Sequence, residues 1–292
     1  MSSTIASPIN VKTSQSPCQN TCFYSFNYDY SNSNCTITNE TDHLKFSYDS
    51  TSSIVVFNDV NYTVEEIRLY KPSLNKYYNS HVDAELIINH SGDGGTNVVV
   101  CIPIISSDSK SSSNTLFHQI IPYAPTSKDP IASINVNNYS LNYFLPRGSY
   151  YSYTGTLPYS TSSEPNNIII FDSAKVTSNM STSDMKLLTS LITTPSNIPP
   201  LNNSYNIKNL FYNSAGTTND ELLEDDDIYI DCKLIDSSGN ATDVANTQSS
   251  TSSSFNMADI TDNIGFQIFV GVAAVTIIYK LIRMKWPKDA AT

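Results

Sequence analysis

Histidine and positive charge are both scarce in this sequence, and each scarcity excludes a class of function. The 292 residues include four histidines, and 16 lysines and arginines stand against 27 aspartates and glutamates. The net charge of −11 disfavours binding to nucleic acids, whose phosphates repel an acidic surface. We therefore expect no nucleic-acid partner. Few histidines also leave little material for a metal site built on imidazole.

The negative charge is concentrated before the C-terminal tail. The residues after 262 carry a net charge of +3, from Lys280, Arg283, Lys285 and Lys288 set against Asp289. Since the whole chain carries −11, residues 1–262 carry −11 − 3 = −14. We expect that part of the chain to be repelled by anionic lipid as well as by nucleic acid.

The five cysteines are an odd number, so they cannot all pair within one chain. Cys101 lies in an apolar run, "VVVCIPI", and is expected to be an ordinary buried thiol. Cys18 and Cys22 have no Cys or His partner at zinc-finger spacing. A disulfide between the N-terminal region and Cys232 is one pairing that the sequence leaves open.

One hydrophobic run stands apart from the rest of the chain. Ile264–Ile282 carries a single charge, Lys280, which lies near its far end and can reach the membrane interface. Because a Ser/Thr-rich stretch precedes the run, we predict a transmembrane helix over 263–283 rather than a buried core helix. The basic tail, 284–292, is expected on the inner side and the bulk of the chain outside.

The remaining boundaries follow from composition. Residues 236–262 are rich in Ser, Thr and Asn without apolar periodicity, which predicts a flexible stalk. The first residues contain no apolar core typical of a signal peptide, so we expect anchoring through the C-terminal helix after synthesis. The predicted organisation is a domain over 1–235, the stalk, the membrane helix over 263–283 and the tail over 284–292.

Short apolar runs separated by polar turns dominate the predicted domain. Tyrosine, at 19 residues, is abundant, and runs such as "DAELIIN" and "NVVVCIPII" have the length and residue types of strands. Ser91–Gly95 between them predicts a tight turn. "STSDMKLLTSLI" has helical periodicity, with Ser183 as the expected N-cap. The domain is therefore predicted to be mainly β with a few helices.

Several motifs occur in the order found in the α-carbonic anhydrase family. Ser7–Val11, "SPINV", resembles the family's S-P-I-N-I, and Ile67–Ser73, "IRLYKPS", occupies the place of F-H-F-H-x-P-S. Asp83–His90, "DAELIINH", takes the place of A-E-L-H-L-V-H, and Leu141–Ile170 follows the family's pattern around Y-x-Y-x-G-S-L-T-T-P-P. The resemblance implies a central, mostly antiparallel ten-stranded sheet with a few peripheral helices.

The resemblance also locates the position of the family's zinc ion, which three histidines bind. Carried over residue by residue, the ligands fall on Arg68, Tyr70 and Ile87. Arginine stays protonated, isoleucine has no lone pair, and a lone tyrosine is a poor zinc ligand. His81 and His90 have no evident third partner for a replacement site. We therefore expect neither a metal or other cofactor nor carbonic anhydrase activity.

Two further residues border this position in the family's pattern. Pro158 and Tyr159 replace a pair of threonines, and with Arg68, Tyr70 and Ile87 they form the candidate ligand-binding cone. One hypothesis is that the arginine and the tyrosine rings bind a sulfate, a carboxylate or a sugar. The alternative is that bulky side chains fill the space that the metal leaves.

Two acids match acidic positions of the family. Glu85 and Glu164 are expected to hydrogen-bond in the neighbourhood of Arg68, because a buried guanidinium needs a partner. We assign them a supporting role rather than a chemical one.

The resemblance extends to a functional hypothesis. Inactive members of the family occur in large DNA viruses, where the cell-surface-binding proteins of poxviruses combine such a domain with a C-terminal anchor. This implies a single-pass protein of the virion membrane, with its N-terminal domain outside, that binds a host-cell receptor or glycan during attachment. The charge of −14 would oppose a polyanionic glycosaminoglycan at long range. The alternatives are a structural membrane protein contacting other virion proteins, and a residual lyase or hydrolase.

Overall fold

The computed structural model describes residues 4–217, with gaps at 13–15, 19–21, 29–30, 32–33, 50–54, 93–94, 96, 129, 176 and 204–208. These residues belong to one compact unit, Met1–Asp226. The predicted stalk, the predicted membrane helix over 263–283, the tail and Cys232 lie outside the described residues. Within the described ranges, no helix is long and apolar enough to cross a membrane.

The secondary structure is mainly β. The strands are β1 (Asn10–Val11), β2 (Ser16–Pro17), β3 (Tyr24–Phe26), β4 (Asn34–Asn39), β5 (His43–Phe46), β6 (Val55–Phe57), β7 (Val60–Tyr70), β8 (Lys76–Tyr77), β9 (Ala84–Gly92), β10 (Asn97–Ser106), β11 (Ile131–Asn135), β12 (Tyr150–Gly155), β13 (Asn166–Phe171), β14 (Ser178–Met180) and β15 (Phe211–Asn213). The helices are α1 (Ser112–Ile120), α2 (Thr182–Leu191) and two 3₁₀ turns, η1 (Ile121–Tyr123) and η2 (Leu141–Tyr143).

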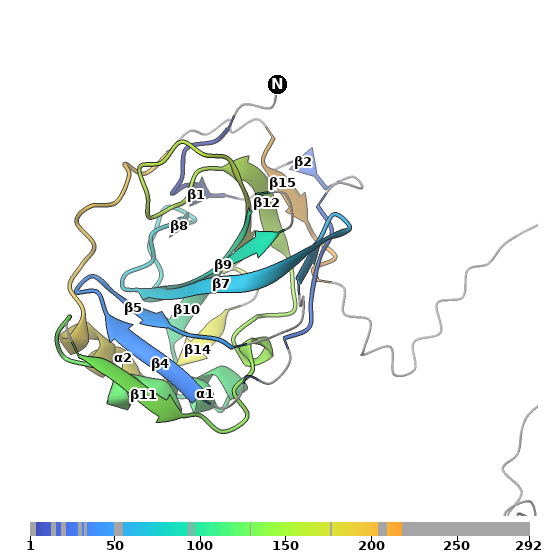
Figure 1. The fold of residues 1–292 in the computed structure, drawn as a ribbon. Helices are drawn as coiled ribbons and strands as arrows, with labels where there is room; N and C mark the ends of the chain where they lie inside the picture. Colours follow the sequence, from blue (N-terminus) through green and yellow to red (C-terminus); the bar gives the residue numbers. More distant parts are fainter. Residues whose placement is uncertain are drawn as a thin grey trace, which may run out of the picture. The chain divides into compact units, whose positions relative to one another are not determined.

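Thirteen of these strands form one mixed sheet, with β7 and β9 crossing its middle (Figure 1). Ten strands lie on a continuous path in the order β11-β4-β5-β7-β9-β10-β13-β12-β15-β2. Most neighbours are antiparallel, whereas β10 pairs in parallel with β13 and β14, and β15 with β2. The prediction of a mainly β domain with few helices is confirmed. The sheet is larger than the ten strands expected, because β3, β6 and β14 join it beside the path.

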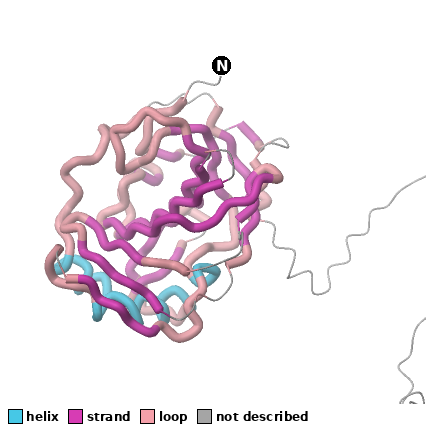
Figure 2. Tube along the Cα trace, in the orientation of Figure 1, coloured by secondary structure: helices cyan, strands magenta, loops and turns pink. Residues whose placement is uncertain are grey.

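The central strands separate two hydrophobic cores. Along β7, Ile67 and Leu69 point into the larger core, which also contains Phe117 of α1. Tyr70, on the same strand, points into the second core, because successive side chains of a strand face opposite sides of the sheet. The helices gather at one end of the domain, where α1 and α2 pack against the larger core (Figure 2). The second core is therefore the one that contains the expected site.

The start of α2 differs from the prediction. The N-cap is Ser181, whose hydroxyl accepts a hydrogen bond from the backbone N–H of Asp184 at 3.1 Å. The same hydroxyl donates to the Asp184 carboxylate at 2.7 Å. Two bonds between Ser181 and the residue three positions later stabilise the first turn, although the carboxylate accepts from the Ser181 hydroxyl and not from the backbone N–H used in a capping box. Ser183, the predicted N-cap, lies inside that turn.

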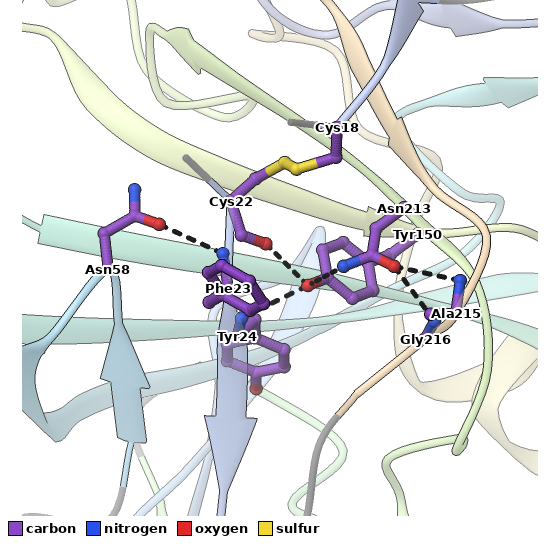
Figure 3. The surroundings of a disulfide bond; sticks show 9 residues. All are labelled: Cys18, Cys22, Phe23, Tyr24, Asn58, Tyr150, Asn213, Ala215 and Gly216. Atoms are coloured by element: carbon purple, nitrogen blue, oxygen red, sulfur yellow. Dashed lines mark hydrogen bonds between the residues drawn. A yellow bond between two sulfur atoms is a disulfide. The ribbon is translucent and has the colours of Figure 1, made fainter. Parts of the chain in front are cut away.

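A disulfide joins Cys18 to Cys22 near the edge of the sheet (Figure 3). These two cysteines thus pair with each other, and neither is the partner that the sequence left open for Cys232. Beside them, the Tyr150 hydroxyl donates to the carbonyl oxygen of Cys22 at 2.7 Å and accepts from the backbone N–H of Tyr24 at 3.1 Å. Cys101 is a free, fully buried thiol, as predicted.

Candidate functional site

The sheet register brings the three expected positions together. Arg68 and Tyr70 lie two residues apart on β7, and Arg68 is directly opposite Ile87 of β9. Opposite residues of an antiparallel pair share a face, so all three side chains converge. Tyr70 and Ile87 are each only 1% exposed. The convergence places one cation among buried side chains, and its partners determine what the site can do.

Arg68 is held by three different contacts. Its Nε donates to Glu66 Oε2 at 2.6 Å, and its Nη1 donates to the Tyr70 hydroxyl at 3.2 Å. The guanidinium carbon lies 4.0 Å from the centre of the Tyr159 ring, a cation–π contact. Glu66 forms a second ion pair with Lys45 on β5. The cation is therefore neutralised by an acid and covered by an aromatic ring.

Aromatic rings close the space around Tyr70. Its ring stacks on His43 with 4.8 Å between ring centres, and on Tyr159 with 6.3 Å between centres. Pro158, which precedes Tyr159, is buried. On the inner side, Ile87 joins the second hydrophobic core. The residues of the candidate cone thus pack against one another.

The pKa values around Arg68 favour the charged pair. Burial acts to raise the pKa of Glu66, but hydrogen bonds from Arg68 and Lys45 outweigh it and hold that pKa below its ordinary value. Partial burial acts to lower the pKa of Arg68, and the hydrogen bonds to Glu66 and Tyr70 raise it overall. Burial raises the pKa of Tyr70 to about 12. Near neutral pH the group is a carboxylate, a guanidinium and a neutral phenol.

The expectation for Glu85 and Glu164 is wrong. Glu85 is fully buried, but its carboxylate binds the segment after β7, including the backbone N–H of Leu74 at 2.8 Å and the Tyr77 hydroxyl at 2.6 Å. Glu164 is exposed, and its backbone forms hydrogen bonds with the Ser162 hydroxyl and the Asn166 side chain. The acid that pairs with Arg68 is Glu66. Spacing could have found it, since residues i and i−2 of a strand share a face.

The comparisons with known proteins identify the fold. No protein-family model matches the sequence, and no curated protein matches it. Among solved structures, the α-carbonic anhydrase of Thermovibrio ammonificans in complex with the inhibitor sulfanilamide is similar, with a TM-score of 0.59 and 16% identity over 72% of this chain and 87% of that one. This chain has the α-carbonic anhydrase fold.

Two other structures support the same fold. The carbonic anhydrase Cah3 of Chlamydomonas reinhardtii, in complex with acetazolamide, has a TM-score of 0.59 and 15% identity over 71% of this chain and 90% of that one. Dioscorin, complexed with ascorbate, has a TM-score of 0.58 and 17% identity over 72% of this chain and 86% of that one. At these identities the likeness establishes the α-carbonic anhydrase fold and leaves activity to the site itself.

The residues present do not fit the zinc ion that this fold implies. Arg68 carries a positive charge directed at Glu66 and Tyr70, so it repels a cation and offers no lone pair. Ile87 has no donor atom. Among the residues that the structure describes, no group of three or more His, Cys, Asp or Glu side chains could hold a metal.

Replacing Arg68 with alanine is expected to lower the free energy of unfolding by about 2 kcal/mol, because Glu66 loses one of its two cations and Tyr159 its cation–π partner. The matched control is Lys45→Ala, which removes the more exposed cation from the same carboxylate and should cost about 0.5 kcal/mol. Urea denaturation measures both. Equal effects of the two changes would contradict a packing role for Arg68.

Proposed function

We propose that this protein is an inactive member of the α-carbonic anhydrase fold that functions as a binding module. The observation that carries the proposal is the packing of Arg68, Tyr70 and Ile87 together with Glu66 and Tyr159, at the positions that the sequence resemblance assigns to the zinc ligands. A water molecule could take the place of a single lost zinc ligand, but it could not offset the positive charge of an arginine beside the metal position. Without a metal, no water of lowered pKa forms there to attack carbon dioxide.

The proposed partner is a receptor or glycan on a host cell, bound by a protein of a large DNA virus during attachment. The predicted membrane helix over 263–283 would hold the domain on the virion membrane, with the N-terminal domain outside. Dioscorin, which shares the fold, is complexed with ascorbate, so a protein of this fold can bind a small polyhydroxylated molecule. Binding without catalysis therefore suits the scaffold.

The first test concerns metal and catalysis. Full-length protein purified in the presence of zinc is expected to contain far less than one zinc ion per chain and to hydrate carbon dioxide at the buffer rate. Metal analysis and a stopped-flow pH-indicator assay measure the two quantities, with an active carbonic anhydrase as the positive control. Stoichiometric zinc, or hydration above the buffer rate, would overturn the proposal of inactivity.

The second test separates attachment from a structural role. Full-length protein in detergent micelles is expected to bind cultured host cells in a saturable manner, and added soluble oligosaccharides should reduce this binding. Antibodies against the domain should also reach it on intact particles. Absence of cell binding, together with co-purification of other virion proteins and no antibody access, would favour the structural alternative instead.

A further inference from the structure

A hollow lies on the other side of the sheet from Arg68. It has a volume of about 720 Å³ and is bordered by α1 and by the segment from Asn137 to Tyr143. The buried residues of α1, such as Leu116 and Phe117, belong to the larger core, whereas Tyr70 and Ile87 belong to the second. This hollow, called the α1 groove below, is therefore separate from the former metal position. Because side chains fill the candidate cone, the α1 groove is the stronger candidate for a ligand-binding site.

The side chains that line the α1 groove carry no formal charge, and all of them except Leu116 have a polar group. Four carry amides, one is an imidazole and one is a phenol: Asn114, Gln119, Asn137, Asn138, His118 and Tyr143. Of the described residues that border the groove, none is a lysine, arginine, aspartate or glutamate. Amides present donors and acceptors together, so such a surface matches a ligand that also carries both. A polyanion would find no fixed cation here.

Hydrogen bonds to the backbone hold two of the four amides, Asn114 and Gln119, in place. Gln119 Oε1 accepts from the backbone N–H of Asn137 at 2.8 Å, and Gln119 Nε2 donates back to the Asn137 carbonyl at 3.5 Å. Asn114 Nδ2 donates to the carbonyl of Ser107 at 2.9 Å. Within the described part of the chain, the buried Asn114 Oδ1 has no hydrogen-bond partner. These two side chains are preorganised, which lowers the entropy lost when a ligand binds beside them.

A buried acid orients the imidazole of the groove. His118 Nδ1 lies 3.3 Å from both carboxylate oxygens of Asp184, which is 3% exposed and is itself fixed by the Ser181 hydroxyl. Nδ1 therefore donates to Asp184, which leaves Nε2 as an acceptor when the ring is neutral. The His118 side chain is 73% exposed, so a ligand can reach that nitrogen.

We propose that the α1 groove binds a neutral oligosaccharide. Sugar hydroxyls donate to and accept from amides and can donate to His118 Nε2, while the C–H face of a pyranose can pack on the Tyr143 ring. The absence of charge among the described lining residues favours a sugar without sulfate or carboxylate. This proposal rests on the proposed function as a binding module and names the class of its ligand.

The test is an array of neutral oligosaccharides, namely N-acetyllactosamine and high-mannose types, printed beside heparin and chondroitin sulfate. Full-length protein in detergent is expected to bind at least one neutral probe. His118→Ala and Asn137→Ala should each weaken that binding about tenfold, the equivalent of one lost hydrogen bond to the ligand. His81→Ala is the matched control, because His81 is also exposed but lies outside the groove. Circular dichroism confirms that each variant folds.

The outcomes separate this inference from the proposed function. Binding of a neutral probe that His118→Ala and Asn137→Ala leave unchanged, or binding of the sulfated probes alone, would overturn the groove assignment and leave the binding module standing. Saturable cell binding without a signal from any probe would overturn the glycan ligand only. Absence of both array binding and cell binding would overturn the two proposals together.

Discussion

Glu85→Ala is expected to lower the free energy of unfolding by about 4 kcal/mol. The carboxylate is completely buried and accepts four hydrogen bonds, from the backbone N–H groups of Leu74 and Asn75, from Asn75 Nδ2 and from the Tyr77 hydroxyl. Alanine would leave all four donors without a partner in the core, and each such donor costs about 1–3 kcal/mol when no water replaces it. Some relaxation of the segment after β7 keeps the total below the simple sum.

Chemical denaturation of full-length protein in detergent, followed by tyrosine fluorescence, measures this loss. Glu164→Ala is the matched control, since Glu164 is exposed and its change should stay within about 0.5 kcal/mol. Both acids match acidic positions of the family, so the sequence alone would predict similar contributions to stability from the two. A Glu85 variant as stable as the Glu164 variant would show that the four hydrogen bonds contribute little to stability.

Acid is expected to destabilise the fold through His90. His90 is fully buried, and burial lowers its pKa from 6.5 to about 4. Its Nδ1 donates to the carbonyl of Val98 at 3.0 Å, so its Nε2 accepts from the Tyr28 hydroxyl at 2.7 Å. Protonation of Nε2 would remove that acceptor and place a charge in the larger core, where Tyr28 lies.

The sign follows from comparing the folded and unfolded states. Below pH 6.5 the unfolded chain binds a proton at His90 and the folded chain does not, so the free energy of unfolding falls as the pH drops. This stabilising contribution is complete above pH 6.5 and decreases between pH 6.5 and about pH 4, with a total loss of about 3 kcal/mol. Denaturation curves at intervals between pH 7 and 4 measure the slope.

His90→Gln should flatten this pH dependence, because glutamine does not titrate and retains one donor and one acceptor. His81→Gln is the matched control, since that side chain is exposed in the folded state and should keep the wild-type slope. An equally steep slope in the His90 variant would assign the acid sensitivity to other groups.

The central part of the fold could be predicted because its signals are local. β9 and β10 are mostly buried, and each contains an apolar run, short in β9 (Leu86–Ile88) and nearly continuous in β10, so length and residue type were sufficient. The convergence of Arg68, Tyr70 and Ile87 followed from the spacing of two on one strand and from the order of the family's motifs. The residue types of each of these strands were enough to predict that it is buried.

The partners of buried charges could not be predicted in the same way. Glu85 lies directly opposite Tyr70 in the sheet, only two positions along the strand from the residue opposite Arg68. The segment that includes Leu74 and Tyr77 folds back over the carboxylate and supplies its donors instead. Such a path depends on backbone turns that no residue spacing encodes. Similarly, the contact of Tyr159 with Arg68 joins a loop to a strand far away in the chain.

The parallel pairing of β2 with β15 has a consequence for the order in which the chain assembles. Pro17 lies opposite Tyr212, and Asn202 donates a hydrogen bond to the carbonyl of Ala6, 196 residues earlier. During synthesis, this N-terminal segment cannot form its contacts with β15 and Asn202 until the ribosome has released the end of the domain. Contacts of such long sequence separation slow folding, and at 5–20 residues per second the delay is tens of seconds. The first segment of the domain to be synthesised is thus among the last to fold.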